Sequence, residues 1–153
     1  MVYIEDTRQQ KGKHETKHAY WSAQGVELLR CKLPFGDYAL PPAVAVDTKE
    51  DMQEIAQNIG GTHAEHVRFR NECYAAKQAG CKLYVLIENR DGIHDLEQVQ
   101  YWDNPRLKYS PKAVTGARLY RAMHTMQDKY GVTFVFCTPE EAAQKITELL
   151  QNG

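Results

Sequence analysis

A single α/β domain, with helices on both faces of a mixed β-sheet, is the fold class that the sequence predicts. Residues 82–87 and 132–136 are nearly continuous apolar runs, which are typical of strands covered on both faces. Segments with the helical spacing of apolar residues lie before, between and after these runs. The first half instead favours short strands joined by turns, because Pro41 and Pro42 cannot lie inside a central ladder. Strands that alternate with helices predict one domain over residues 1–153.

The first half carries most of the predicted strands. Gly25 ends the first helix and Pro34 ends the strand that follows it. Thr62 and Glu65 form a capping-box sequence, which marks the start of a longer helix. The predicted strands here cover residues 2–4, 26–33, 37–40 and 44–48, and the predicted helices cover residues 18–24, 50–59 and 62–79.

The second half alternates strands with helices. Leu96, Val99 and Trp102 have the spacing of a short helix, and Gly131 ends a longer helix whose buried face includes Met123 and Met126. The predicted strands cover residues 82–87 and 132–136, and the predicted helices cover residues 115–130 and 138–150.

Composition excludes several classes of protein. Charged residues make up 25% of the chain and hydrophobic residues 42%, so disorder is not expected. No apolar run reaches the roughly 18 residues of a membrane span, and the charged N-terminal region argues against a secretory signal, so we expect a cytoplasmic protein. The cysteines are scattered without a Cys-x-x-Cys pair, which predicts reduced, mostly buried thiols and argues against zinc or disulfides: Cys31, Cys73, Cys81 and Cys137.

Asp37, Asp47 and Lys49 form the candidate catalytic group. Asp47 and Lys49 are two apart on a predicted strand, so they share a face. If residues 41–43 form the loop, Asp37 lies opposite Asp47 on that face, whereas a slip of one residue would turn it away. Two carboxylates beside a phosphate suit Mg²⁺, which polarises the phosphoryl oxygen and lowers the pKa of a bound water. A nearby lysine can orient that water.

A wider set of motifs resembles the nuclease domain of the XPF excision-repair endonuclease family, in the PD-(D/E)XK superfamily. The motifs are Asp6-x-Arg8, Gly36-Asp37-Tyr38 and Val46-Asp47-Thr48-Lys49, with a helix bearing Arg68 and the strand Leu83–Glu88. The resemblance covers residues 2–90 and implies a restriction-endonuclease-like core with Mg-dependent endodeoxyribonuclease activity on branched or flapped DNA, Mn²⁺ being a substitute. It also implies a homodimer and no organic cofactor. The small stand-alone form looks like bacteriophage and prophage versions, with residues 93–153 as an elaboration of that branch.

The resemblance also implies roles for individual residues. Asp37 and Asp47 would be metal ligands and Lys49 the catalytic lysine, with Asp6 as a further catalytic acid at the rim. The phosphate backbone would be held by Arg8, Arg68 and Arg70, and the downstream acid would be Asp51 or Glu54, although neither has the family's spacing. The chain departs from the family pattern at three positions, where the family has Glu, Glu and Arg: Gln9, Asp47 and Thr48.

Structural interpretations compete with these roles. Asp37 after glycine is also typical of a turn, and Lys49 to Asp51 of a solvated helix start. Glu65 is interpreted as a capping residue. Glu72 is interpreted as a surface charge, with a further acid of the site as the alternative. The pair His63/His66 has metal-ligand spacing but no third ligand at a suitable spacing. His14 and His18 also have such spacing and are interpreted as surface residues. Tyr101-Trp102 is interpreted as a buried anchor of its loop, with a base-stacking platform as the alternative.

Two alternative functions stay open. The first is a catalytically impaired, nuclease-derived module that binds DNA or protein. The second is an enzyme acting on another phosphodiester, such as RNA or a nucleotide second messenger.

Overall fold

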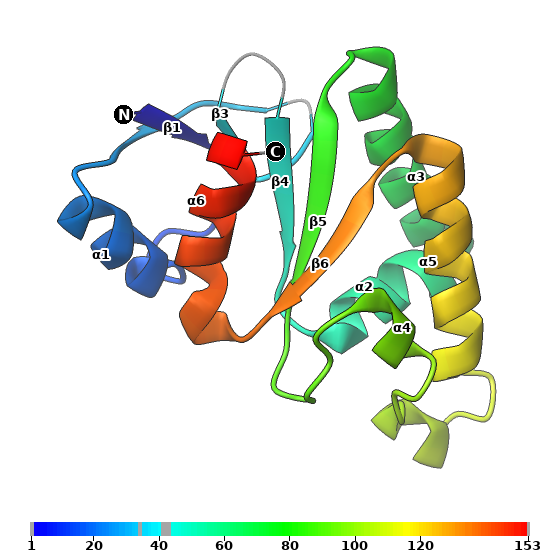
Figure 1. Ribbon diagram of the computed structural model, residues 1–153. Coiled ribbons are helices and arrows are strands. Elements are labelled where there is room, and N and C mark those ends of the chain that lie inside the picture. Colours follow the sequence, from blue (N-terminus) through cyan, green and yellow to red (C-terminus); the bar gives the residue numbers. More distant parts are fainter. Residues whose placement is uncertain (1, 34, 41–43, 153) are drawn as a thin grey trace.

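A six-stranded mixed sheet forms the centre of the protein in a computed structural model, which describes residues 2–33, 35–40 and 44–152. The strand order is β2-β1-β3-β4-β5-β6. The strands are β1 (Val2–Glu5), β2 (Glu27–Arg30), β3 (Tyr38–Leu40), β4 (Val44–Lys49), β5 (Lys82–Glu88) and β6 (Thr133–Cys137). β3 pairs antiparallel with both β1 and β4, whereas the β1–β2, β4–β5 and β5–β6 pairs are parallel. The predicted mixed sheet is confirmed (Figure 1).

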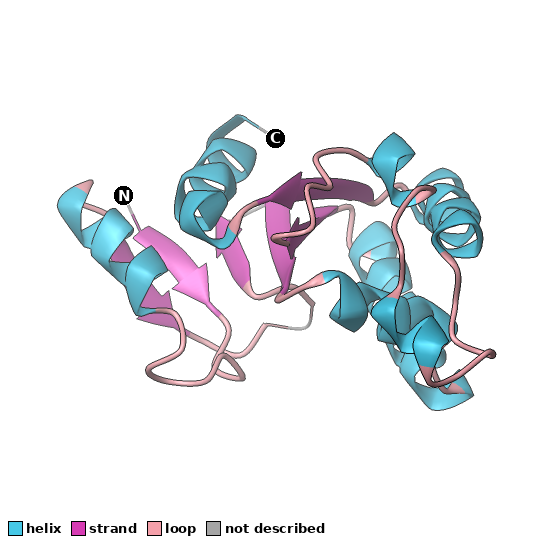
Figure 2. Cartoon of the chain, turned by 90° about the horizontal axis from the view of Figure 1, so that it is seen from below, coloured by secondary structure: helices cyan, strands magenta, loops and turns pink. Residues whose placement is uncertain are grey.

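Helices cover both faces of the sheet, as predicted. They are α1 (Glu15–Ala23), α2 (Met52–Gly60), α3 (His63–Gln78), α4 (Leu96–Val99), α5 (Gly116–Tyr130) and α6 (Ala142–Asn152), with the 3₁₀ turns η1 (Pro105–Lys108) and η2 (Pro139–Glu141). The helices α2, α3, α4 and α5 pack in one buried cluster with one face of the sheet, and α1 and α6 pack in a second cluster with the other face. Figure 2 shows the two groups of helices on opposite sides of the strands.

The central strand β5 contributes to both clusters. Val85 and Ile87 lie in the larger cluster, whereas Leu86 between them lies in the smaller one, and all three are fully buried. A strand covered on both faces needs apolar residues at successive positions, which explains the continuous run in the sequence. The run 132–136 has the same origin, because Phe134 and Phe136 of β6 lie in the larger cluster and Val135 between them packs against the smaller one.

Trp21 joins α1 to the sheet and to α6. Its ring lies edge-on to Tyr3 of β1 and Tyr38 of β3, with centroids 5.8 and 5.0 Å away. Its indole Nε1 donates a hydrogen bond to the Thr147 hydroxyl of α6 at 2.9 Å. The side chain is fully buried, so this contact holds α1 against the sheet and buries a large aromatic surface.

Several element boundaries differ from the prediction. α1 begins at Glu15, three residues before the predicted start at 18; an acidic first turn favours the earlier start. α2 begins at Met52 because the Asp51 carboxylate caps it, accepting from the backbone N of Glu54 at 2.8 Å. β2 covers only Glu27–Arg30 of the predicted 26–33. The predicted connection at residues 41–43 lies outside the described residues.

Other sequence predictions are confirmed. Thr62 and Glu65 form the capping box of α3, and Met123 and Trp102 are buried. All four cysteines are free thiols, but Cys31 is exposed and only Cys73 and Cys137 are fully buried.

Among the described residues no helix has the length and apolar character to cross a membrane.

Candidate active site

The register of β3 and β4 places Asp37 beside Asp47. Tyr38 pairs with Val46, so Asp37 and Asp47 follow as the next opposed positions, which confirms the predicted register. The Asp37 backbone N donates to the Val46 carbonyl at 2.7 Å. The backbone N and the hydroxyl of Thr48 both donate to Oδ2 of Asp37, at 2.6 and 2.9 Å. These bonds fix the carboxylate, so Asp37 is more than a turn residue.

Gly36 permits this approach of the two strands. Its φ of +75° is in the left-handed region, where side chains are strained. A Cβ at this position would lie 3.1 Å from the Cβ of Ala45 and 3.3 Å from the carbonyl oxygen of Val46. The glycine before Asp37 is therefore required by both conformation and space.

Asp47 and Lys49 form a buried ion pair on the predicted common face. The Lys49 Nζ lies 2.9 Å from Oδ2 of Asp47, and both side chains are more than 90% buried. The ammonium also lies 4.7 Å from the ring centroid of Phe69 in α3. Burial lowers the pKa of Lys49, but the charge of Asp47 and its hydrogen bond outweigh burial and raise it. Lys49 is therefore a fixed cation at neutral pH, not a solvated residue at a helix start.

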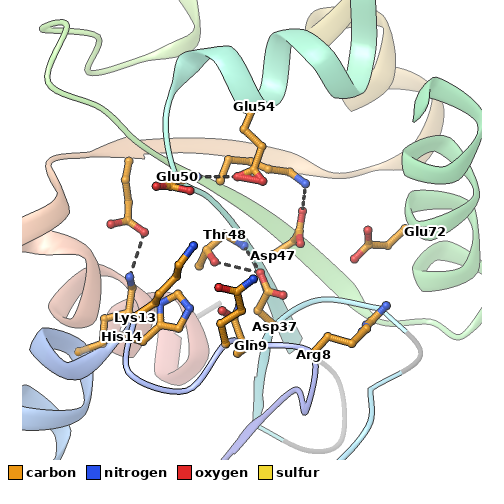
Figure 3. Close-up of a pocket in the computed structure, with 14 residues that line it drawn as sticks. Arg8, Gln9, Lys13, His14, Asp37, Asp47, Thr48, Glu50, Glu54 and Glu72 are labelled. Atoms are coloured by element: carbon orange, nitrogen blue, oxygen red, sulfur yellow. Dashed lines mark hydrogen bonds and ion pairs between the residues drawn. The ribbon is translucent and has the colours of Figure 1, made fainter. Parts of the chain in front are cut away.

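These three side chains line a cavity of about 600 Å³ at the edge of the sheet. Figure 3 shows carboxylates and cations converging on this space. The carboxylates belong to Asp37, Asp47, Glu50, Glu54, Glu72 and Glu88, the cationic side chains to Arg8, Lys13, Lys17 and Lys49, and the remaining lining residues are Gln9, Gln10, His14 and Thr48. A space that holds both charges suits an anionic substrate and a bridging cation.

Glu72 faces this cavity, so its interpretation as a surface charge is wrong. Its Oε1 accepts a hydrogen bond from the backbone N of Gly36 at 2.7 Å. It follows Phe69 by three positions on α3, so the two side chains share a helix face. Burial, and next the charge of Asp47, raise the pKa of Glu72. Helix α3 thereby adds an acid to the strand pair.

The two candidates for the downstream acid lie differently. Glu54 lines the cavity and accepts from the backbone N of Glu50 at 2.7 Å. Asp51 is occupied as the N-cap of α2, where its carboxylate accepts from the backbone N of Glu54. Of the two, Glu54 is placed to reach a ligand in the cavity.

Asp37 and Asp47 are placed to hold a divalent cation that needs few protein ligands. Burial, and next the charge of Asp47, raise the pKa of Asp37 well above its usual range, against the hydrogen bonds from Thr48. A bound cation would relieve this repulsion. Within residues 2–33, 35–40 and 44–152, no three His, Cys, Asp or Glu side chains are grouped to hold a metal. Asp37 and Asp47 are thus the two carboxylates that could hold a hard divalent cation, whose other ligands would be waters.

Asp6 lies behind the cavity and holds Arg8. The Asp6 carboxylate is fully buried and pairs with Nε of Arg8, and it accepts from the backbone N of Leu33 at 2.8 Å. Arg8 lines the cavity while Asp6 does not. Because the Arg8 side chain is 59% exposed, a ligand can reach it. The structure thus places Asp6 as a positioning residue and not at the rim among the reacting groups.

Arg68 and Arg70 lie on different sides of α3. Arg68 lines a cavity of about 470 Å³ that shares Arg8, Lys49, Glu54 and Glu72 with the first. Arg70 instead lines a separate cavity with Tyr74 and Lys129. Residues two apart on a helix point about 200° apart, because each residue turns the helix by about 100°. The two arginines cannot both face the phosphate side, and Arg70 is not brought to the site.

A family model of the ERCC4 domain matches residues 6–150 of this chain. The chain belongs to the ERCC4 domain family, that of the XPF-type nucleases. The match continues past residue 90, where the resemblance in the sequence ended, and includes β6 and α6. No curated protein has a sequence that matches the chain significantly.

Solved structures share the fold of this ERCC4 domain. XPF from Aeropyrum pernix matches with a TM-score of 0.69 and 18% identity over 99% of this chain and 64% of that chain. The same protein in a complex with DNA matches with a TM-score of 0.69 and 18% identity, over 98% and 63% of the two chains. The ERCC4 domain described here thus spans less than two thirds of that relative, and the likeness shows the fold.

The interpretation of His14 as a surface residue is wrong, because it lines the ERCC4 domain's cavity and its Nδ1 is buried. The sequence did not single out Lys13 or Lys17, which α1 and the preceding loop bring to the same cavity. Lys17 is buried there and pairs with Glu88 at the end of β5, Nζ to Oε2 at 3.0 Å. Lys13 and His14 also line the space, whereas His18 pairs with Glu5 at 2.6 Å instead. Lys13 and His14 precede the first residue of α1, so no helical spacing in the sequence marks them.

Proposed function

We propose that this chain is a metal-dependent endonuclease that hydrolyses phosphodiester bonds in DNA, with a preference for branched or flapped structures. The observation that carries the proposal is the group of Asp37, Asp47 and Lys49 on one wall of a cavity lined by further cations. Membership of the ERCC4 domain family supports the nuclease assignment.

Each residue has a proposed role. Asp37 and Asp47 would hold Mg²⁺, or Mn²⁺ in its place, and the bound metal would activate a water and polarise the phosphoryl oxygen. Lys49, kept cationic by Asp47, stabilises the charge that develops on the phosphate. Arg8, held by Asp6, contacts the phosphate backbone at the cavity entrance, and Arg68 contacts it from the adjoining cavity.

Two of the departures from the family motifs are compatible with activity. Asp47 lies 2.9 Å from Lys49, so the shorter acid still reaches the lysine. Thr48 stands where the family has arginine, and its hydroxyl donates to Asp37. With Thr48 in place of arginine, a contact to phosphate is lost, but a hydrogen bond that fixes the proposed metal ligand Asp37 is gained.

DNA is the proposed partner. The relative from Aeropyrum pernix has been solved in a complex with DNA, and the cations of this cavity suit a phosphate backbone. Arginine and lysine contacts to phosphate position a duplex without reading bases, which supports selectivity for structure over sequence. We also propose a homodimer, following the tendency of this family, and a cytoplasmic location.

A cleavage assay tests the activity. Labelled flap, branched and duplex DNA would be incubated with the wild type, Asp47→Asn and Lys49→Ala, in Mg²⁺, in Mn²⁺ and in EDTA. Loss of a metal ligand removes several kcal/mol of transition-state stabilisation, so Asp47→Asn should cleave at least about 100-fold more slowly. Asp91→Asn, at an exposed position away from the cavity, is the matched control. Equal cleavage by wild type and Asp47→Asn would reject the assignment.

The remaining departure, Gln9 in place of the family's Glu, favours a second candidate, a binding module that has lost catalysis. It predicts DNA or protein binding without metal-dependent turnover. An RNA and cyclic-dinucleotide panel in the same assay tests the third possibility, an enzyme for another phosphodiester.

A further inference from the structure

The cavity has a second cationic wall, which comes from the loop before α1 and the first turn of α1. Its members are Lys13, His14 and Lys17. Figure 3 shows Lys13 and His14 on one side of the central carboxylates, with Arg8 and Glu72 on the other side. A chain of phosphates that crosses the carboxylate pair would therefore meet cations at both ends of the cavity.

Lys13 and His14 have unused hydrogen-bonding capacity. Within the described part of the chain, the Lys13 ammonium has no hydrogen-bond or ion-pair partner, although the side chain lines the cavity. Nδ1 of His14 is buried and also lacks a partner there. A buried polar atom without a partner costs free energy, so a ligand that pairs with it recovers that cost.

Lys17 determines the charge of this wall. Glu88 also lines the cavity and would repel a phosphate, but Lys17 lies 3.0 Å from it and cancels its charge. Both side chains are about nine-tenths buried. With this pair neutral, Lys13 gives the wall a net positive charge.

We propose that Lys13 and His14, with Lys17 neutralising Glu88, form a subsite for a DNA phosphate that flanks the one to be cut. The subsite rests on the proposed function, because it names a second contact of the same substrate. Lys13 supplies the charge and His14 a directional hydrogen bond, while Arg8 holds the backbone at the opposite end of the cavity.

Binding measurements in a cleavage-deficient background test the subsite. The parent would be the full chain with Asp37→Asn, which keeps the buried Asp47–Lys49 pair intact, titrated against a fluorescein-labelled flap DNA at several salt concentrations. Each lost phosphate contact lowers the slope of log K against log salt by about 0.9 for duplex DNA. Lys13→Ala should lower this slope by about 0.9 and weaken binding several-fold, and His14→Ala should weaken binding with little change of slope.

Lys108→Ala is the matched control, because Lys108 is exposed and lines none of the cavities described above. It should leave both affinity and slope unchanged. Lys17→Met leaves the charge of Glu88 uncancelled and should weaken binding, and adding Glu88→Gln should restore it. A double variant that binds as weakly as Lys17→Met would overturn the role given to Lys17. A slope for Lys13→Ala equal to that of Lys108→Ala would overturn the subsite.

A neutral methylphosphonate placed at one phosphate at a time locates the contact. At the flanking position it should weaken binding by the parent, but not further weaken binding by Lys13→Ala. Additive losses at every position would overturn the subsite. A parent that binds DNA in this manner, from a wild type that does not cut, would reject the nuclease and keep the subsite. If the wild type cuts DNA but Lys13→Ala leaves the slope unchanged, the nuclease function stands and the subsite is rejected. A parent that binds no DNA would reject both the nuclease function and the subsite.

Discussion

The two walls of the cavity differ in how the chain builds them. The wall formed by Asp37, Asp47 and Lys49, here called the acidic wall, comes from the paired strands β3 and β4. Their register places Asp37 opposite Asp47. Alternation along β4 places Lys49 on the same face as Asp47. The second cationic wall, here called the basic wall, comes from the loop before α1 and the first turn of α1, a helix that packs on the sheet through Trp21. The first is held by backbone hydrogen bonds and local sequence, and the second by tertiary packing. The acidic wall should therefore be the more sensitive to substitution.

The largest expected effect is on stability, at Lys49→Met. This change leaves the buried carboxylate of Asp47 without its partner, and breaking a buried pair typically costs about 3–5 kcal/mol. Urea unfolding would measure the loss. Lys49→Met with Asp47→Asn should recover most of it, and a double variant as unstable as the single one would show that the pair is not coupled.

Asp37→Asn is expected to lower the cleavage activity and to raise the stability. Cleavage should fall at least about 100-fold, because a metal ligand is lost. The melting temperature without metal should rise by a few degrees, since the pKa of Asp37 is raised by burial and by Asp47, and the neutral amide removes that cost. Thermal melting with and without Mg²⁺ checks this, and a lower melting temperature for the variant in EDTA would contradict it.

A smaller effect is expected at Gly36→Ala. The positive φ and the close Cβ of Ala45 should cost about 1–3 kcal/mol and displace Asp37. Gly12 also has a positive φ, of 84°, but a Cβ there would meet no atom within 4 Å. Gly12→Ala therefore isolates the conformational cost from the crowding. Equal unfolding free energies and equal cleavage rates for the two variants would remove the crowding argument.

The smallest effect separates two arginines on one helix. Arg68→Ala should weaken DNA binding and lower its salt slope by about 0.9, whereas Arg70→Ala should not. Anisotropy titrations at several salt concentrations compare them. Equal slopes would mean that the bound DNA reaches both sides of α3.

Much of the fold and the acidic wall were predictable because local patterns determine them. Continuous apolar runs identified β5 and β6, and alternation identified the shared face of Asp47 and Lys49. Helix faces were harder to predict. Glu72 lies three positions from Phe69 on a helix with a narrow apolar stripe, so its orientation depended on where α3 docks.

The basic wall shows the same limit more strongly. Nothing local distinguishes Lys13 and His14 from the other polar residues of the loop, and only the packing of α1 brings them to the cavity. Asp6 was expected among the reacting groups, but its carboxylate turns towards Leu33 and Arg8. The amide of residue 33 lies 27 positions further along the chain, beyond the reach of motif spacing.

The fluorescence of Trp21 can report on the position of α1 and therefore on the basic wall. The chain contains two tryptophans, and the second, Trp102, belongs to the cluster on the opposite face of the sheet. In a Trp102→Phe variant all indole emission would come from the residue that fastens α1. Shifts of the emission spectrum during titration with DNA would then report changes in the packing of α1 on the sheet. They would not report changes in β3 and β4, which position Asp37 and Asp47.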